Sequence, residues 1–287
     1  MANRRVLVKR RKAVANVRKI TRTMQLIATA RFQAAFNRAV ATRPYTQKLA
    51  ELIDDLAGAG VALDHPLLAA GNAEAPATLL VLTSNRGLCG GYNASVLRVA
   101  AEAIAARASA PLALHVFGKK GVAYFRYRQR EMAEQVTTIG EAPRFEHIEP
   151  IANRLMEDFL AGRTSSVSVV YMRFHSAGQQ RPAVLRLLPL EQERPASHGG
   201  PAIEYEFLPE PRALLDDLLP ATIRVRLLQA FMDAAVSEQI ARMVAMKAAT
   251  EAAEDMIRTL TRQYNRARQS HITMELLDIV GGANALA

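Results

Sequence analysis

The sequence predicts an α/β protein in which the N- and C-terminal ends of the chain form a long antiparallel coiled coil that carries an inserted globular domain. Three observations predict this fold class. No glycine or proline interrupts the helix-forming residues between Pro220 and Gly281. The N-terminal stretch from Lys9 to Ala57 also lacks glycine, and Pro44 is its only proline. Between these two stretches, short apolar runs alternate with helical patterns, as in an α/β domain.

The C-terminal stretch has the pattern of a coiled-coil helix. Small or apolar residues recur three and four positions apart and leave one narrow stripe on the helix. They are Ile223, Leu227, Phe231, Ala234, Ala249, Ala253, Met256, Leu260, Tyr264 and Ala267. At 1.5 Å per residue this helix is about 90 Å long, more than a compact domain of this size can bury. We expect a separate short helix over Pro211–Leu219, a start of the long helix at Pro220, and an end at Gly281-Gly282.

The N-terminal stretch is the expected partner of that stripe. Its apolar residues show the same spacing, at Val14, Val17, Ile20, Met24, Ile27 and Ala34. We expect Arg43-Pro44 to bend this helix and Gly58 and Gly60 to end it. Two separate helices of an ordinary bundle are the alternative. Two long helices at opposite ends of one chain are more simply explained as an antiparallel pair.

The residues between the two helices predict a Rossmann-like, mostly parallel α/β sheet with an antiparallel edge. The expected strands are 78–83, 112–117, 166–174, 184–190 and 203–207. Helices are expected after the first strand, with Asn93 or Ser95 as the N-cap, after the second strand to about Arg130, and over Glu149–Leu160. The predicted domains are therefore 1–60, 75–208 and 209–287, of which the last pairs with the first.

The composition predicts a soluble, cytoplasmic protein, or one held at a membrane only through other proteins. Half of the residues are apolar, which is enough for a core. The basic N-terminal residues lack the apolar region of a signal peptide, and no apolar run is long enough to span a membrane. The single cysteine, Cys89, cannot form an internal disulfide, which fits a reducing compartment.

Positive charge is concentrated near the N-terminus. The formal net charge is +10, and residues 1–50 hold thirteen Lys or Arg and no acidic residue. A block of one sign usually marks an acidic partner, such as nucleic acid phosphates, anionic lipid or an acidic protein surface. A solvated helix face is the simpler alternative, but such faces normally mix both signs.

Motifs for catalysis or cofactor binding are absent from the sequence. The loop Gly87–Gly91 follows a strand, but it does not satisfy G-x-G-x-x-G and lacks the G-K-[ST] ending of a P-loop. A tight turn that needs glycine is the favoured interpretation, with Cys89 as a buried small residue and His115 as a core histidine. There is no G-x-S-x-G, no H-E-x-x-H and no clustered Cys and His. We therefore predict no catalytic residue, no cofactor and no metal site.

Four segments carry a resemblance to a known family. The C-terminal pattern Ile-Thr-x-Glu-x-x-Asp-x-x-x-Gly-Ala is met by Ile272, Thr273, Glu275, Asp278, Gly282 and Ala283. Val17–Met24, Thr83–Gly91 and Ser237–Lys247 match the same family in the same order. Over nearly its whole length the chain resembles the gamma subunit of F-type ATP synthase. It departs from the usual sequences at Asn85, at Tyr92 and over the segment Phe32–Leu63.

The resemblance implies a non-catalytic subunit that acts as a shaft. Such a shaft rotates inside a ring of alternating alpha and beta subunits and couples transmembrane ion flow to ATP synthesis and hydrolysis. The implied partners are the alpha and beta subunits of the catalytic head, the epsilon subunit and the membrane c-ring. The implied location is peripheral, at the cytoplasmic face of the cell membrane, with membrane contact only through the c-ring.

The resemblance also implies contact residues. The head-contact positions of the family fall on Met24, Arg242, Gln269 and Thr273, although coiled-coil packing is the alternative for Met24. The small or apolar tip of the C-terminal helix, which includes Ile279 and Val280, suits a bearing. A basic face would meet acidic levers on the beta subunits, and it comprises Arg10, Arg11, Lys12, Arg18, Lys19 and Arg22.

Two proteins of other classes remain as alternatives. A basic coiled-coil nucleic-acid-binding protein would use the first fifty residues to contact phosphates, with steep salt dependence. A small α/β enzyme would bind a nucleotide at the Gly87–Gly91 loop without any partner subunit.

Overall fold

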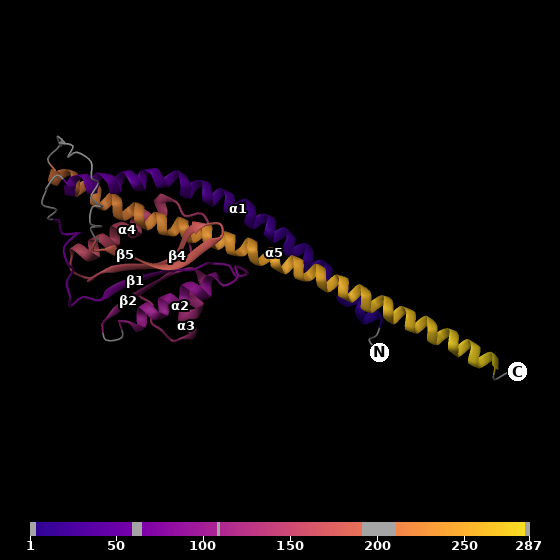
Figure 1. Ribbon diagram of the computed structural model, residues 1–287. Coiled ribbons are helices and arrows are strands. Elements are labelled where there is room, and N and C mark those ends of the chain that lie inside the picture. Colours follow the sequence, from indigo (N-terminus) through magenta and orange to yellow (C-terminus); the bar gives the residue numbers. More distant parts are fainter. Residues whose placement is uncertain (1–3, 59–64, 108–109, 191–210, 285–287) are drawn as a thin grey trace. The chain divides into compact units, whose positions relative to one another are not determined.

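A computed structural model describes residues 4–58, 65–107, 110–190 and 211–284 of the 287-residue chain (Figure 1). Two long helices lie at the ends of the described chain, α1 (Arg4–Gly58) and α5 (Pro211–Asn284). None of the described helices has a stretch long and apolar enough to cross a membrane.

The chain divides into two compact units, and both long helices contribute to each of them. Met1–Thr29 and Arg242–Ala287 form the first, called here the helix-pair unit. Ala30–Ala241 form the second, called here the sheet unit.

Among the described residues, the sheet unit contains a five-stranded sheet with the order β3-β2-β1-β4-β5. The strands are β1 (Ala77–Leu82), β2 (Leu112–Phe117), β3 (Glu134–Val136), β4 (Val167–Ser176) and β5 (Gln179–Leu188). β1 pairs in parallel with β2 and β4, and β2 pairs in parallel with β3, whereas β4 and β5 are antiparallel. The predicted mostly parallel sheet with an antiparallel edge is confirmed.

Helices cover both faces of the sheet (Figure 1). α2 (Tyr92–Ala105) and α3 (Lys119–Tyr127) lie on one face, and α4 (Phe145–Leu160) and α5 lie on the other. The alternation of side chains along β1 serves both cores. Leu79 and Val81 pack with α2 and α3, while Leu80 and Leu82 pack with α4 and α5. All six residues of β1 are buried as a result.

The part of α5 in the sheet unit is buried on nearly all sides. Ile223 and Leu227 pack against the sheet and α4. Val236 and Ile240 pack instead with Ala35, Ala39 and Phe174, and Ala35 and Ala39 belong to α1. The predicted single narrow stripe is therefore wrong for this part of the helix, because α5 has neighbours on two sides here.

The ends of the long helices differ in part from the prediction. α5 begins at Pro211 and continues through Pro220, so the predicted separate helix over Pro211–Leu219 is wrong. A proline removes one backbone donor. Leu219 and Ile223 are both buried on either side of Pro220, and we attribute the continuity to this packing. α5 also continues past Gly281, whereas α1 contains Pro44 and ends at Gly58 as predicted.

Two further differences concern the sheet. β3 was not predicted, because a three-residue strand is too short to show an alternating pattern. The predicted strand 203–207 and the predicted loop 191–201 lie outside the described residues.

Gly118 joins the end of β2 to α3 in a conformation that requires glycine. Its φ is 97°, in the region that L side chains rarely adopt. A Cβ added to this residue would lie 2.1 Å from the carbonyl oxygen of Thr83 at the end of β1. The Gly118 N–H also donates to the carbonyl of Val136 in β3 (2.9 Å). One residue therefore holds the ends of three strands together.

We predict that Gly118→Ala lowers the free energy of unfolding by about 2–4 kcal/mol, since it combines backbone strain with a steric clash. Urea unfolding followed by circular dichroism measures this loss. Gly140→Ala is the control, because no atom lies within 4 Å of an added Cβ there. A Gly118 variant as stable as the Gly140 variant contradicts the strained-turn interpretation.

Candidate partner-binding surface of the terminal helices

Polar groups in the loop between β1 and α2 form hydrogen bonds with Asn93 at the start of α2. The Ser84 N–H donates to Asn93 Oδ1 (3.0 Å), and Asn93 Nδ2 donates to Ser84 Oγ (2.8 Å) and to Cys89 Sγ (3.2 Å). Cys89 is buried, as predicted. The N-cap of α2 is Gly91, so the prediction of Asn93 or Ser95 as the cap is wrong. Asn93 lies inside α2, one residue past its start, and its side chain hydrogen-bonds to the preceding loop.

His115 on β2 lies beside an ion pair. Its Nδ1 is 2.8 Å from Glu134 Oε2, without the geometry of a hydrogen bond, and Arg154 Nη2 donates to the same oxygen (2.6 Å). Burial lowers the pKa of His115, although the Glu134 carboxylate opposes this effect. The lowered pKa favours the neutral form of His115 at neutral pH. Within the described ranges, no three His, Cys, Asp or Glu side chains gather as a metal site.

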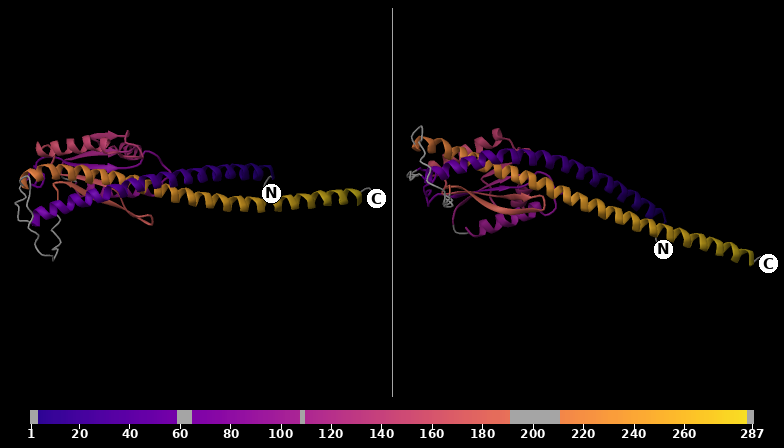
Figure 2. Two further views of the ribbon diagram at one scale, coloured as in Figure 1. Left: turned by 90° about the horizontal axis from the view of Figure 1, so that it is seen from above. Right: turned by 45° about the horizontal axis from the view of Figure 1, so that its top comes forward.

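In the helix-pair unit, α1 and α5 run side by side in opposite directions (Figure 2). Three contacts set the register. Thr250 Oγ1 donates to Thr21 Oγ1 (2.8 Å), Arg18 Nη1 lies 3.9 Å from Glu254 Oε1, and the Arg11 guanidinium lies 5.6 Å from the centre of the Tyr264 ring. In these three contacts the residue number on α1 decreases as the residue number on α5 increases, so the two helices are antiparallel. The predicted coiled coil of the two ends is confirmed.

Buried and half-buried residues follow a four-three spacing on both helices, as in a coiled coil. On α1 this seam is Leu7, Arg11, Val14, Arg18, Thr21, Gln25 and Ala28. On α5 it is Met246, Thr250, Ala253, Ile257, Leu260, Tyr264 and Ala267. The predicted stripes and the observed seam share five residues, which are Val14 on α1 and Ala253, Leu260, Tyr264 and Ala267 on α5.

Several residues predicted for the seam point outward instead. Val17, Ile20, Ile27 and Met256 are exposed, and Ile20 is 59% exposed. On α5, Ile257 takes the seam position next to Met256. On α1, Arg11, Arg18 and Gln25 occupy seam positions, where long polar side chains can pack their aliphatic stems. A pattern of apolar residues alone misses these seam positions of α1 and picks out the apolar residues beside them.

The helix pair therefore exposes large apolar side chains that its own seam does not use. On α1 these are Val6, Val8, Val17, Ile20, Leu26 and Ile27. On α5 they are Met256, Ile272, Met274, Leu276, Leu277, Ile279 and Val280. Every described residue from Arg268 to Gly281 is exposed. Apolar patches of this extent usually mark a protein-protein interface.

The predicted basic face is divided between contacts within the pair and exposed positions. Arg11 stacks on Tyr264, and Arg18 faces Glu254. Arg22 Nη1 donates to Gln25 Oε1 (3.3 Å). Arg10, Lys12 and Lys19 are exposed. The six residues therefore do not form one exposed face, because Arg11 and Arg18 contact α5.

The predicted head-contact residues lie in two environments. Gln269, Thr273, Ile279 and Val280 are exposed on the last turns of α5, where Thr273 Oγ1 donates to the carbonyl of Gln269 (3.0 Å). Arg242 is 6% exposed, and Met24 is half-buried. The four exposed residues are accessible to solvent, whereas Arg242 is mostly covered by its own chain. Leu26, Leu276 and Leu277 are exposed as well, and apolar residues at positions outside the seam are a signal that the sequence carries for them.

Comparison with known proteins identifies the family. The family described as ATP synthase matches residues 3–286 of this chain. An ATP synthase gamma chain of Rhodopirellula baltica is 44% identical over 294 residues, which cover 100% of this chain and 99% of the relative. The chain belongs to the ATP synthase gamma-chain family. A gamma chain of Frankia casuarinae is 42% identical, over 97% of this chain and 96% of the relative.

Solved structures share the gamma-chain fold at low sequence identity. A chain of the OSCP/F1/c-ring structure of the Euglena gracilis mitochondrial ATP synthase has a TM-score of 0.69 at 21% identity, over 99% of this chain and 94% of that chain. A chain of the central stalk and c-ring structure from Tetrahymena thermophila has a TM-score of 0.58 at 19% identity, over 80% of this chain and 99% of that chain. These chains therefore share the fold of this protein although most residues differ.

We predict that Thr21 and Thr250 stabilise the helix pair jointly. Thr250→Val removes a buried hydrogen bond across the seam and is expected to cost about 1 kcal/mol. A double-mutant cycle with Thr21→Val should show a coupling of about 0.5–1.5 kcal/mol in urea unfolding. Thr23→Val is the control, since Thr23 is exposed and bonds only within α1. Additive effects of the two seam variants would refute the contact.

Proposed function

We propose that this chain is the non-catalytic gamma subunit of an F-type ATP synthase and forms the central stalk that turns inside the catalytic head. Family membership over the whole chain supports this proposal. The observation that carries it is the helix-pair unit, whose outer face and last turns expose apolar side chains. A stalk that turns within a sleeve needs an apolar surface of this kind, since strong polar bonds to the sleeve would hold it in place.

The same surface explains how such a stalk could couple rotation to catalysis elsewhere. Its two helices are unequal, because α5 continues as a single exposed helix where the seam ends. An asymmetric stalk contacts each subunit of a surrounding ring differently, and so can bias one catalytic site at a time. The exposed cations Arg10, Lys12 and Lys19 would attract acidic side chains by about 1 kcal/mol or less each. Attractions this weak guide rotation without stopping it.

The proposed partners are the alpha and beta subunits, the epsilon subunit and the c-ring. The proposed location is the cytoplasmic face of the cell membrane, reached only through the c-ring. The alternative of a nucleic-acid-binding protein has less support, because Arg11 and Arg18 pack against α5. An electrophoretic shift of DNA at physiological salt would favour that alternative instead.

Co-purification with the alpha and beta subunits tests the proposed function. A tagged chain expressed in its own cells should co-purify with the alpha and beta subunits and with ATPase activity. The chain and the two subunits should elute together in gel filtration. Recovery of the chain without alpha and beta subunits would overturn the proposal.

We predict that Gln269→Ala lowers ATP hydrolysis and synthesis by the assembled complex by about fivefold or less, because an exposed polar contact is worth about 1 kcal/mol. Gln269 is exposed, so the stability of the isolated chain should not change. Thr259→Ala is a matched control, as Thr259 is also exposed on α5. Wild-type rates of ATP hydrolysis and synthesis for the Gln269 variant would contradict a role of this residue in the contact with the head. Arg242→Ala is less informative, since Arg242 is buried and its loss also affects folding.

A further inference from the structure

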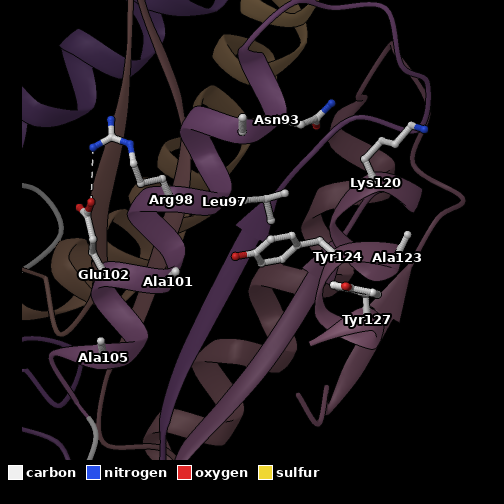
Figure 3. Close-up of a pocket in the computed structure, with 11 residues that line it drawn as sticks. Asn93, Leu97, Arg98, Ala101, Glu102, Ala105, Lys120, Ala123, Tyr124 and Tyr127 are labelled. Atoms are coloured by element: carbon white, nitrogen blue, oxygen red, sulfur yellow. Dashed lines mark hydrogen bonds and ion pairs between the residues drawn. The ribbon is translucent and has the colours of Figure 1, made fainter. Parts of the chain in front are cut away.

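An open groove lies between α2 and α3, on the face of the sheet unit opposite α4 and α5 (Figures 1 and 3). Its volume is about 880 Å³. Small, aromatic and charged side chains of both helices line it. We call it the α2–α3 groove.

The shape of the α2–α3 groove suits another helix. Ala94, Ala101 and Ala105 line it from α2, and Ala123 lines it from α3. Side chains this small leave room for the ridge of a third helix to approach closely. α2 has 14 residues and so is about 21 Å long, which is enough to align about four turns of a partner helix.

Aromatic side chains give the groove the character of a binding site. Figure 3 shows Tyr124 projecting between the two helices beside Leu97, with Tyr127 next to it. Tyr127 is 87% exposed. Tyrosine is enriched in the central residues of protein interfaces, since it adds a large contact area and one hydrogen bond at small entropic cost.

The charge around the groove indicates the chemistry of its partner. Lys120 lines the groove, and the Arg128 guanidinium lies 5.6 Å from the ring centre of Tyr124, another lining residue. Glu102 in the lining faces Arg98 at 3.3 Å, so its charge is balanced. A partner with acidic side chains along its edges would be complementary. A second copy of this chain is disfavoured, because it would bring the same positive charge.

We propose that the α2–α3 groove binds an amphipathic helix of another protein, with small and leucine-like residues on its buried face and carboxylates on its flanks. This mode of recognition places apolar anchors at helical spacing in a groove and uses charge at the rim for specificity. The inference does not rest on the proposed rotary function, since it uses only the surface of the sheet unit.

A designed peptide tests this proposal on the full chain. The probe is a fluorescein-labelled helix of about 18 residues, with leucines at helical spacing and glutamates on both flanks, and its comparison peptide has lysines in place of the glutamates. Fluorescence anisotropy should show saturable binding of the glutamate peptide and at least tenfold weaker binding of the lysine peptide. Failure of the glutamate peptide to bind, or equal binding of both peptides, overturns the proposal.

Variants of the groove locate the binding site. Ala101→Glu and Ala123→Glu place a carboxylate on each side of the groove and should weaken binding at least tenfold. Ala248→Glu is the matched control, an exposed helical alanine in the helix-pair unit, and should leave binding unchanged. Circular dichroism confirms that each variant is folded. If the control weakens binding as much as the groove variants do, the peptide binds by charge alone and the proposal fails.

Discussion

The structure depends on the way one helix, α5, is buried. In the sheet unit it has neighbours on two sides, the sheet with α4 and the second half of α1. In the helix-pair unit it has α1 alone, and it is buried only along its seam. A single helix can serve both roles because no glycine or proline interrupts it between Pro220 and Gly281. In the helix-pair unit, where α5 has fewer neighbouring elements, it exposes apolar side chains. These exposed side chains form the candidate binding surface.

The seam itself is built from small and long polar side chains more than from large apolar ones. Thr21, Ala28, Thr250 and Ala253 are buried between the helices. Their small size favours close approach of the backbones. The Thr250 hydroxyl donates to Thr21 Oγ1, and the Thr21 hydroxyl donates to the carbonyl of Arg18 (3.1 Å), so both hydroxyl groups are satisfied. Because the seam does not need the larger residues, Val17, Ile20 and Ile27 are left for the outer face. The chain thus separates the residues that hold the pair together from those available to a partner.

Much of this fold could be predicted from the sequence, and the failures have physical causes. The antiparallel helix pair, the parallel sheet and its antiparallel edge follow from helix-forming stretches and apolar runs, which are local signals. The predicted seam position of Ile20 is wrong because Arg11 and Arg18 occupy the seam of α1 with aliphatic stems that apolar counting ignores. The predicted seam position of Met256 is wrong because the neighbouring Ile257 is the half-buried residue on α5. The predicted boundary between two helices at Pro220 is wrong, because a local sequence pattern does not show the tertiary packing of Leu219 and Ile223. Exposure of Gln269 and Thr273 agrees with a contact role, whereas the burial of Arg242 could not be read from spacing.

The seven-residue repeat of Leu7, Val14, Thr21 and Ala28 has a mechanical consequence. A repeat of seven is shorter than two full turns of a straight α-helix, so two helices that keep it in contact coil around each other in a left-handed sense. A left-handed rope tightens when twisted one way and loosens when twisted the other. The helix pair is therefore chiral as a torsion spring, stiffer against torque of one sign than against the reverse.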